Sequence, residues 1–196
     1  MNNKVQNVLL GVLAIGLIGI TVAYAALTQQ LKIEGTAKVA SSKWDVHFGT
    51  VSAGNAQGYA TAGTLAKTGE TTIAGDIGTL KAPGDSITYT FDIENAGDIN
   101  AIIDTVTGGK SFTCTSATKS VADAVCKDLT YSIKYTDGNA TIAKGDKLAK
   151  ATNSSTPTKK NVTLTLTYKS TATTVASEDV TVTADPMTIT YVQDAK

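Results

Sequence analysis

The feature that most constrains the fold of this chain is an alternation of apolar and polar residues with a period of two, which recurs beyond residue 27. In its clearest stretch, residues 87–94, every second residue is apolar: Ile87, Tyr89, Phe91 and Ile93. Successive side chains of a β-strand point to opposite faces of a sheet, so this pattern predicts a strand with one buried face. No stretch beyond residue 27 keeps a helical period over three turns. The chain is therefore expected to be all-β.

Further stretches repeat the alternation and predict strands at residues 31–34, 44–48, 129–135, 162–168 and 187–191. Turn-forming residues separate them at Pro83-Gly84-Asp85, at 95–98 and at Asp137-Gly138. Short strands with such turns predict an antiparallel β-sandwich of jelly-roll or immunoglobulin-like type. Gly49–Gly78 has few large apolar residues and is expected to be a long surface excursion with minor strands. Lys144–Lys160 is polar and predicts an exposed loop.

The N-terminal segment predicts export. Lys4 precedes an uncharged apolar run, Val8–Ala26, whose last residues include Ala23-Tyr24-Ala25. Small residues at Ala23 and Ala25 fit a signal-peptidase site, with cleavage after Ala25. The alternative is a retained membrane anchor over residues 5–26, since the run approaches the roughly 20 residues that span a bilayer. Either reading predicts a secreted or cell-surface protein with a signal or anchor helix at 1–25 and one domain at 26–196.

Two cysteines, Cys114 and Cys126, lie in the exported part. An oxidising compartment predicts that they form a disulfide, which in the chain-entropy account stabilises the fold by about 3 kcal/mol. Their spacing, with no histidine nearby, does not fit a redox Cys-x-x-Cys pair or a zinc site. We therefore expect a structural bridge.

The remaining chemistry points away from catalysis. His47 is the only histidine, so no pair of histidines can bind zinc, and its position on the polar side of residues 44–48 predicts an ordinary exposed side chain. Aspartates lie mainly at turns, where turn hydrogen bonds explain them more simply than calcium ligation. The 17 basic side chains are all lysines and balance 17 acidic ones, which argues against a nucleic-acid partner. We expect no enzyme activity, no metal and no cofactor.

Several motifs together resemble the camelysin and TasA-like proteins of Gram-positive bacteria. They are the Ala-Tyr-Ala end of the export segment, Gly35-Thr36, Trp44–Phe48, Leu80–Phe91 with its Pro-Gly-Asp turn, Asn95-x-Gly97 and the closing residues 189–193. The resemblance spans most of the chain. It implies a jelly-roll-like exported protein, processed by a dedicated signal peptidase, that assembles into biofilm-matrix or pilus-like fibres. Camelysin-type relatives have also been classed as metallopeptidases, but a chain with one histidine and no zinc motif gives no catalytic residues to carry over.

Cleavage after Ala25 would free residues 26–39, in which Leu27, Leu31 and Ile33 can serve as apolar anchors. Such a segment can complete the sheet of a neighbouring subunit, and this head-to-tail exchange propagates a filament of identical subunits. The alternative is that these residues form the first strand of their own domain. Two other functions stay open: a monomeric surface adhesin that binds through the 49–78 or 144–160 loops, and a camelysin-type peptidase.

Overall fold

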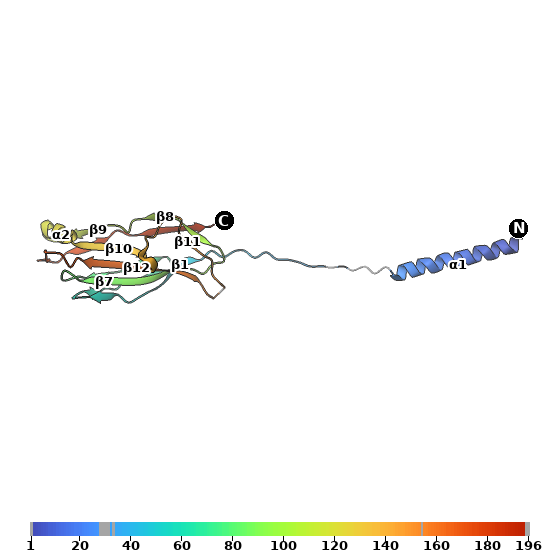
Figure 1. Cartoon of the computed structure of the whole chain (residues 1–196), viewed down its shortest axis with the longest axis horizontal. Coiled ribbons are helices and arrows are strands. Elements are labelled where there is room, and N and C mark those ends of the chain that lie inside the picture. The colour runs from blue at the N-terminus through green and yellow to red at the C-terminus, as the bar shows by residue number, and fades with distance from the viewer. Residues whose placement is uncertain (1, 28–31, 33, 154, 195–196) are drawn as a thin grey trace. The chain divides into compact units, whose positions relative to one another are not determined.

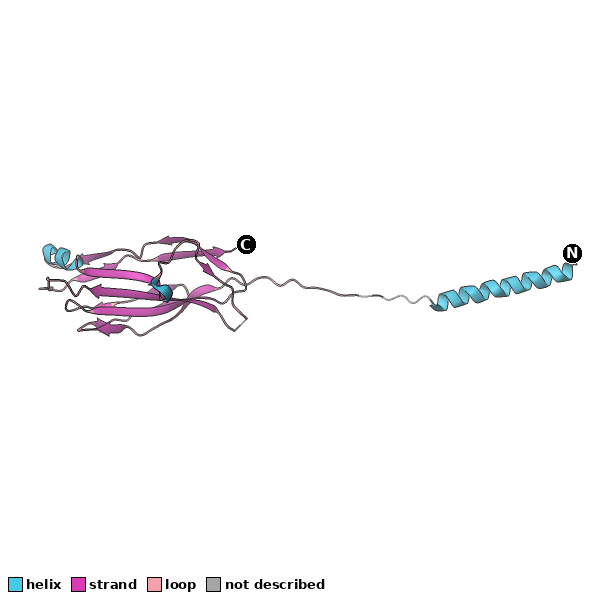
Figure 2. Cartoon of the chain, viewed as in Figure 1, coloured by secondary structure: helices cyan, strands magenta, loops and turns pink. Residues whose placement is uncertain are grey.

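A computed structural model describes residues 2–27, 32, 34–153 and 155–194 of the chain (Figure 1). These residues divide into two units, Met1–Ala40 and Ser41–Lys196. The first unit contains helix α1, Asn3–Leu27, drawn in cyan in Figure 2. Within the described part of the chain, no helix combines the length and apolar character that crossing a membrane requires. Residues 34–45 form neither helix nor strand.

The larger sheet of the second unit is built around the pair β7 (Ser86–Asn95) and β12 (Thr158–Tyr168). These strands pair antiparallel along the whole of β7. The sheet order is β1-β7-β12-β10, with β1 at Val46–Val51, β10 at Leu129–Tyr135, and β2 (Asn55–Gln57) paired to the other end of β7. The apolar residues of the alternating stretches all point to one face, as their sequence period requires.

The second layer consists of two interrupted strands. β8 (Ala101–Thr107) pairs with β14 (Thr188–Gln193), and β9 (Phe112–Thr115) pairs with β13 (Thr181–Ala184); β11 (Lys147–Leu148) pairs with β8. Gly108 and Gly109 separate β8 from β9, with φ of 69° and 70°. Only glycine adopts this backbone readily, and an added Cβ on Gly108 would overlap the Pro186 carbonyl oxygen.

Smaller elements complete the unit. β4 (Ala66–Gly69) and β5 (Thr72–Ala74) form a short hairpin, and the strands on either side of it in the chain, β3 (Thr61–Ala62) and β6 (Gly78–Thr79), pair antiparallel with each other. Helix α2 spans Lys119–Cys126, and a 3₁₀ turn spans Asp137–Asn139.

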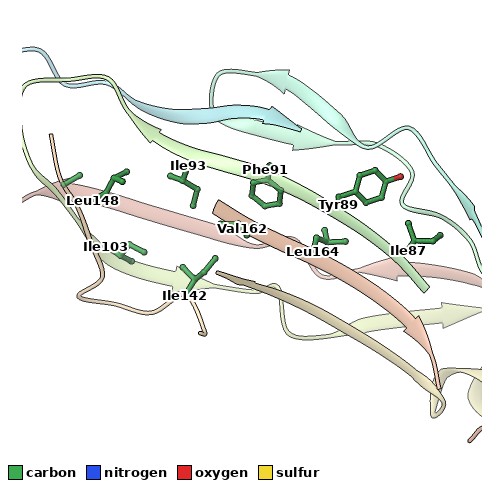
Figure 3. Packing of buried hydrophobic residues seen from close by; sticks show 10 residues of the cluster. Ile87, Tyr89, Phe91, Ile93, Ile103, Ile142, Leu148, Val162 and Leu164 are labelled. Carbon is green, nitrogen blue, oxygen red and sulfur yellow. The ribbon is translucent and has the colours of Figure 1, made fainter. Parts of the chain in front are cut away.

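The core lies between the two layers. Figure 3 shows its central residues: Ile87, Tyr89, Phe91, Ile93, Ile103, Ile142, Leu148, Val162 and Leu164. Phe48 packs edge-to-face on Phe91, with ring centroids 5.7 Å apart. A second, smaller cluster of Val125, Leu129 and Tyr168 lies beneath α2. Both layers contribute side chains to the main cluster, which makes the unit β-sandwich-like.

The antiparallel, mainly β architecture confirms the all-β class predicted from the alternation. The 129–135 strand matches its prediction, but the 44–48 strand begins at Val46 because Trp44 and Asp45 have no paired neighbours in β7. The exposed-loop prediction for Lys144–Lys160 is wrong in part: Leu148 is 0% exposed, since it pairs with Ala101 and fills the core. Helix α2 was not predicted, because its single buried face covers only two turns.

Candidate functional site

A hollow of about 900 Å³ in the second unit opens beside β13. Residues 75–81 form one wall and residues 176–184 form the other. Its floor is apolar and consists of Val125, Leu129, Leu166 and Tyr168. An apolar floor between two extended segments suits a ligand that is itself an extended chain with apolar side chains on one face.

The wall formed by β13 presents free backbone groups to this hollow. The Asp185 N–H donates to the Ser111 carbonyl over 2.9 Å, and the same register continues into Thr183↔Thr113 and Thr181↔Thr115. Hydrogen-bonded pairs alternate along an antiparallel ladder, so the backbone groups of Val182 and Ala184 point away from β9. Among the described residues, β13 pairs with β9 alone. The wall is therefore an open sheet edge, able to accept another strand.

A second hollow of about 170 Å³ lies further along the same polypeptide. It lies between β1 and the run 187–191 that contains the start of β14. Its lining includes His47 and Thr71 and the apolar side chains of Val46, Phe48, Met187, Ile189 and Tyr191. In the described sheets, β14 also pairs on one side only, with β8. The two hollows thus border consecutive stretches, 176–184 and 187–191. We call them together the edge groove.

The rim of the edge groove is acidic. Asp76, Glu178 and Asp179 line the larger hollow together with one base, Lys81. Two of the acids are fixed by backbone donors: Asp76 accepts from the Gly78 N–H at 3.0 Å and Glu178 accepts from the Thr118 N–H at 2.7 Å. An occupant with basic side chains on its polar face would be favoured electrostatically.

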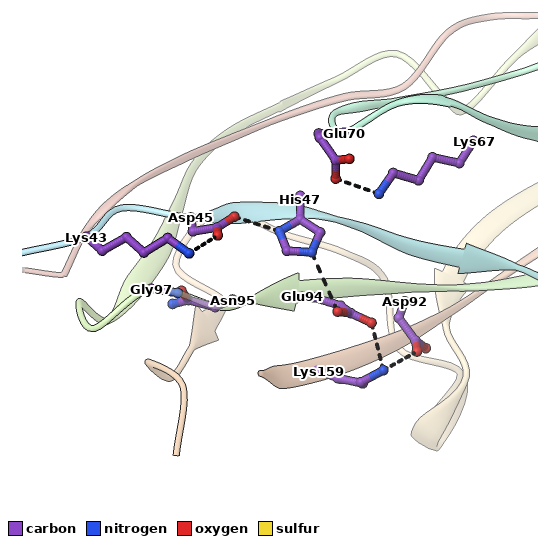
Figure 4. A network of polar contacts seen from close by, with 10 residues as sticks. All are labelled: Lys43, Asp45, His47, Lys67, Glu70, Asp92, Glu94, Asn95, Gly97 and Lys159. Carbon is purple, nitrogen blue, oxygen red and sulfur yellow. Dashed lines mark hydrogen bonds and ion pairs between the residues drawn. The ribbon is translucent and has the colours of Figure 1, made fainter. Parts of the chain in front are cut away.

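The only histidine lies on the outer face of the larger sheet, in the polar network of Figure 4. His47 Nδ1 is 2.7 Å from Asp45 Oδ1, and Nε2 is 3.6 Å from Glu94 Oε2. Its side chain is 19% exposed, so the prediction of an ordinary exposed histidine is wrong: the two carboxylates and strand β7 cover it. Lys159 contacts Glu94 at 2.7 Å and Asp92 at 3.3 Å.

Opposite charges in this network stabilise one another. The hydrogen bond from Lys43 lowers the pKa of Asp45 despite its partial burial, and His47 lowers it further. Glu94, and then Asp92, raise the pKa of Lys159. In the described part of the chain, no group of three or more histidine, cysteine, aspartate or glutamate side chains is arranged to hold a metal ion.

The predicted disulfide is confirmed, between Cys114 in β9 and Cys126 at the end of α2. Ala23 and Ala25 of the predicted cleavage site, and the anchor Leu27, belong to helix α1. The anchors Leu31 and Ile33 lie outside the described residues. The rest of the predicted assembly segment, residues 32 and 34–39, is exposed and in no strand, and Val39 is 95% exposed.

Sequence reasoning missed the edge groove. Its walls are polar, Gly- and Thr-rich segments at 75–81 and 176–184, which carry no residue type that signals binding. The available signal was indirect: Val180, Val182 and Ala184 alternate with polar residues, as in a strand with one inner face. Comparison with known proteins adds no name, because no protein-family model, curated protein or solved structure matches the chain.

Proposed function

We propose that this protein is a structural subunit of an extracellular fibre, of the biofilm-matrix or pilus-like kind, and that its N-terminal segment adds as a strand to the edge groove of the next copy. One observation carries the proposal. The chain contains a segment with the alternation of a strand, whose described residues 32 and 34–39 lie in no strand, and a groove with a strand edge that pairs on one side only among the described residues.

The segment fits the groove in pattern. Apart from Gly35, the odd positions from 31 to 39 are apolar: Leu31, Ile33, Ala37 and Val39. Polar residues occupy the even positions between them. A strand with this pattern can place its apolar face on the floor formed by Leu129, Leu166 and Tyr168, while its backbone pairs with Val182 and Ala184.

The N-terminal segment also matches the edge groove in length and in charge. Residues 26–39 and the groove-lining run from 176 to 191 are of similar length, so an extended segment can follow the groove from one hollow into the other. The segment carries Lys32 and Lys38 against one acid, Glu34, whereas the rim carries three acids and one lysine. Because the donor and the acceptor are different surfaces of one chain, the contact does not close and propagates a filament.

The proposal includes the finer architecture and the route to the cell exterior. We place the β-sandwich-like unit in the jelly-roll or immunoglobulin-like group, and we propose that residues 1–25 act in export, as a cleaved signal or a retained anchor. The confirmed disulfide is in keeping with an oxidising compartment. The resemblance to the camelysin and TasA-like proteins supports the same assembly role.

The test compares purified chains that begin at Ala26 and at Gly35, by electron microscopy and light scattering. Every buried side chain of the described core lies beyond residue 84, so both chains keep that core. We expect filaments from the longer chain only. Stable monomers from both would refute the fibre proposal and favour a monomeric surface adhesin.

Two pairs of matched variants locate the contact. In the donor, Leu31→Lys with Ile33→Lys should abolish filaments, whereas Thr28→Lys with Gln30→Lys adds the same charge at even positions and should preserve them. In the acceptor, Val182→Lys should abolish filaments because this side chain lines the groove, whereas Thr113→Lys, at an exposed position of β9 that does not line the groove, should not. Equal effects within either pair would contradict strand addition at this groove.

A further inference from the structure

The disulfide holds the floor of the edge groove. Cys126 ends helix α2, and Val125, the preceding residue, lines the larger hollow while being only 4% exposed. Cys114 packs against the same small cluster, Val125, Leu129 and Tyr168. The bond therefore ties the helix that supplies part of the floor to β9, the partner of the groove's edge strand β13.

Few other interactions hold α2 in place. It has only eight residues, Thr118 makes no side-chain cap hydrogen bond, and its first turn has no acidic residue. Its one ion pair, Lys119–Asp123, is exposed and lies within the helix itself. Helices this short are marginal in water without tertiary contacts. Burial of Ala122 and Val125 and the disulfide thus account for its position.

The other end of the helix is connected to the rim. The turn before α2 binds Glu178 through the Thr118 N–H, at 2.7 Å, and Glu178 lines the larger hollow. Displacement of α2 would therefore disturb the floor through Val125 and the rim through Glu178. The main core, by contrast, contains neither cysteine and no residue of α2.

We infer that the Cys114–Cys126 disulfide is a redox gate on strand uptake: the oxidised chain has a complete edge groove, and the reduced chain loses the groove while the main core stays folded. This inference rests on the proposed function and adds its regulation. Reduction needs a dithiol. Its first thiolate attacks one cysteine sulfur and expels the other as a thiolate, and its second thiol then attacks the mixed disulfide and releases the first cysteine; the products are two cysteine thiols and the cyclic disulfide of the reductant. Both cysteines are partly exposed and accessible to this attack.

The redox gate would make assembly depend on whether the compartment around the chain is reducing or oxidising. A chain in a reducing cytosol carries free thiols and cannot take up a donor strand, whereas a chain that has reached an oxidising exterior can. Premature polymerisation inside the cell is thereby prevented without a separate chaperone.

The experiment measures binding of a labelled synthetic peptide, residues 26–39, to the chain that begins at Gly35, with and without dithiothreitol. The peptide has no cysteine, so the reductant acts on the domain alone. Fluorescence anisotropy gives the affinity, and the fluorescence of Trp44, the only tryptophan, next to β1 and far along the chain from α2, reports whether the larger sheet stays folded. We expect reduction to weaken binding at least about tenfold with Trp44 fluorescence unchanged.

Two variants complete the design. The double variant Cys114→Ser with Cys126→Ser should bind as weakly as the reduced chain and ignore dithiothreitol. Val125→Ala keeps the bond and should weaken binding in the oxidised chain. Equal affinity of the oxidised and reduced chains would overturn the gate, and so would a loss of binding that follows the unfolding of the larger sheet. If the oxidised chain does not bind the peptide at all, the proposed function itself fails.

Discussion

Strand β7 and the segment at 31–39 share one sequence pattern, but β7 is paired within a sheet, whereas the described residues of the segment lie in no strand. In β7, every inner residue is buried against β12 and the second layer. In the N-terminal segment, the described residues 34–39 are exposed and in no strand. The difference teaches that alternation encodes the capacity to form a strand, whereas a partner with a free edge determines whether it forms. We propose that the edge groove beside β13 is such a partner.

The largest expected effect comes from the paired region. Ile87→Ala removes a fully buried side chain from β7 and should lower the free energy of unfolding by about 2–5 kcal/mol. Val182→Ala at the half-buried groove edge should lower it by only roughly 1 kcal/mol. Urea unfolding of both variants measures the contrast. Equal losses would mean that the edge groove is as tightly packed as the core.

The second effect concerns the turn that introduces β7. Asp85 is buried and accepts three backbone hydrogen bonds, from the N–H groups of Tyr59 (2.8 Å), Lys81 (2.7 Å) and Ala82 (2.9 Å). Asp85→Ala leaves these donors without an acceptor and should cost about 3 kcal/mol. Ser86→Ala, the next residue on the partly exposed face, is the control and should change stability little.

Asp85 also predicts a pH dependence. Burial acts to raise the pKa of its carboxyl, but the three backbone donors outweigh burial and bring the pKa below the ordinary 3.8. Its stabilising contribution is then complete above that value and is lost as pH falls through the lower folded pKa. Unfolding measured from neutral to acidic pH should show this loss in the wild type, and Asp85→Asn should flatten the curve. An equal acid dependence in the two proteins would contradict the assignment.

A third effect appears at alkaline pH. Tyr135 of β10 and Tyr191 of β14 are hydrogen-bonded to each other through their side chains. Burial raises the pKa of both side chains, and the pKa of Tyr191 rises to about 12 from an ordinary 10.0. Above pH 10.0 the unfolded chain releases a proton that the folded chain retains, so stability falls as pH rises toward about 12. Tyr191→Phe should remove its part of this loss, about 2 kcal/mol. Tyr59→Phe, at a highly exposed tyrosine, should not.

These contrasts show which parts of the fold and of the candidate site could be predicted from the sequence alone. The alternation at 87–94 and 162–168 predicted the central strands, because a period of two leaves one arrangement that buries all the apolar residues. The disulfide followed from two cysteines in a chain predicted to be exported. The edge groove could not be predicted, because it depends on which strand is left without a neighbour, a property of sheet order. The partial burial of His47 could not be predicted either, because Glu94 lies beside it only through the β1–β7 register.

The smallest expected effect tests that polar network on the outer face. Gly49 follows His47 on the same face of β1, and an added Cβ there would overlap Glu94 Oε1 and approach Asp92 Cβ to 3.0 Å. Gly49→Ala should therefore push the Glu94 carboxylate away from His47 and Lys159, which NMR signals of the His47 ring would report. Because the displaced carboxylate can move into solvent, the stability cost should stay within about 1 kcal/mol.

Gly69 provides the matched control, since a Cβ added there meets no atom within 4 Å. Gly69→Ala should leave both the His47 signals and the stability unchanged. Filament formation should be unaffected in both variants, because His47 borders the edge groove but Gly49, Glu94 and Lys159 do not line it. If Gly49→Ala abolished filaments while Gly69→Ala did not, the outer face of the larger sheet would itself take part in subunit contacts, and the edge groove would not be the sole surface through which subunits meet.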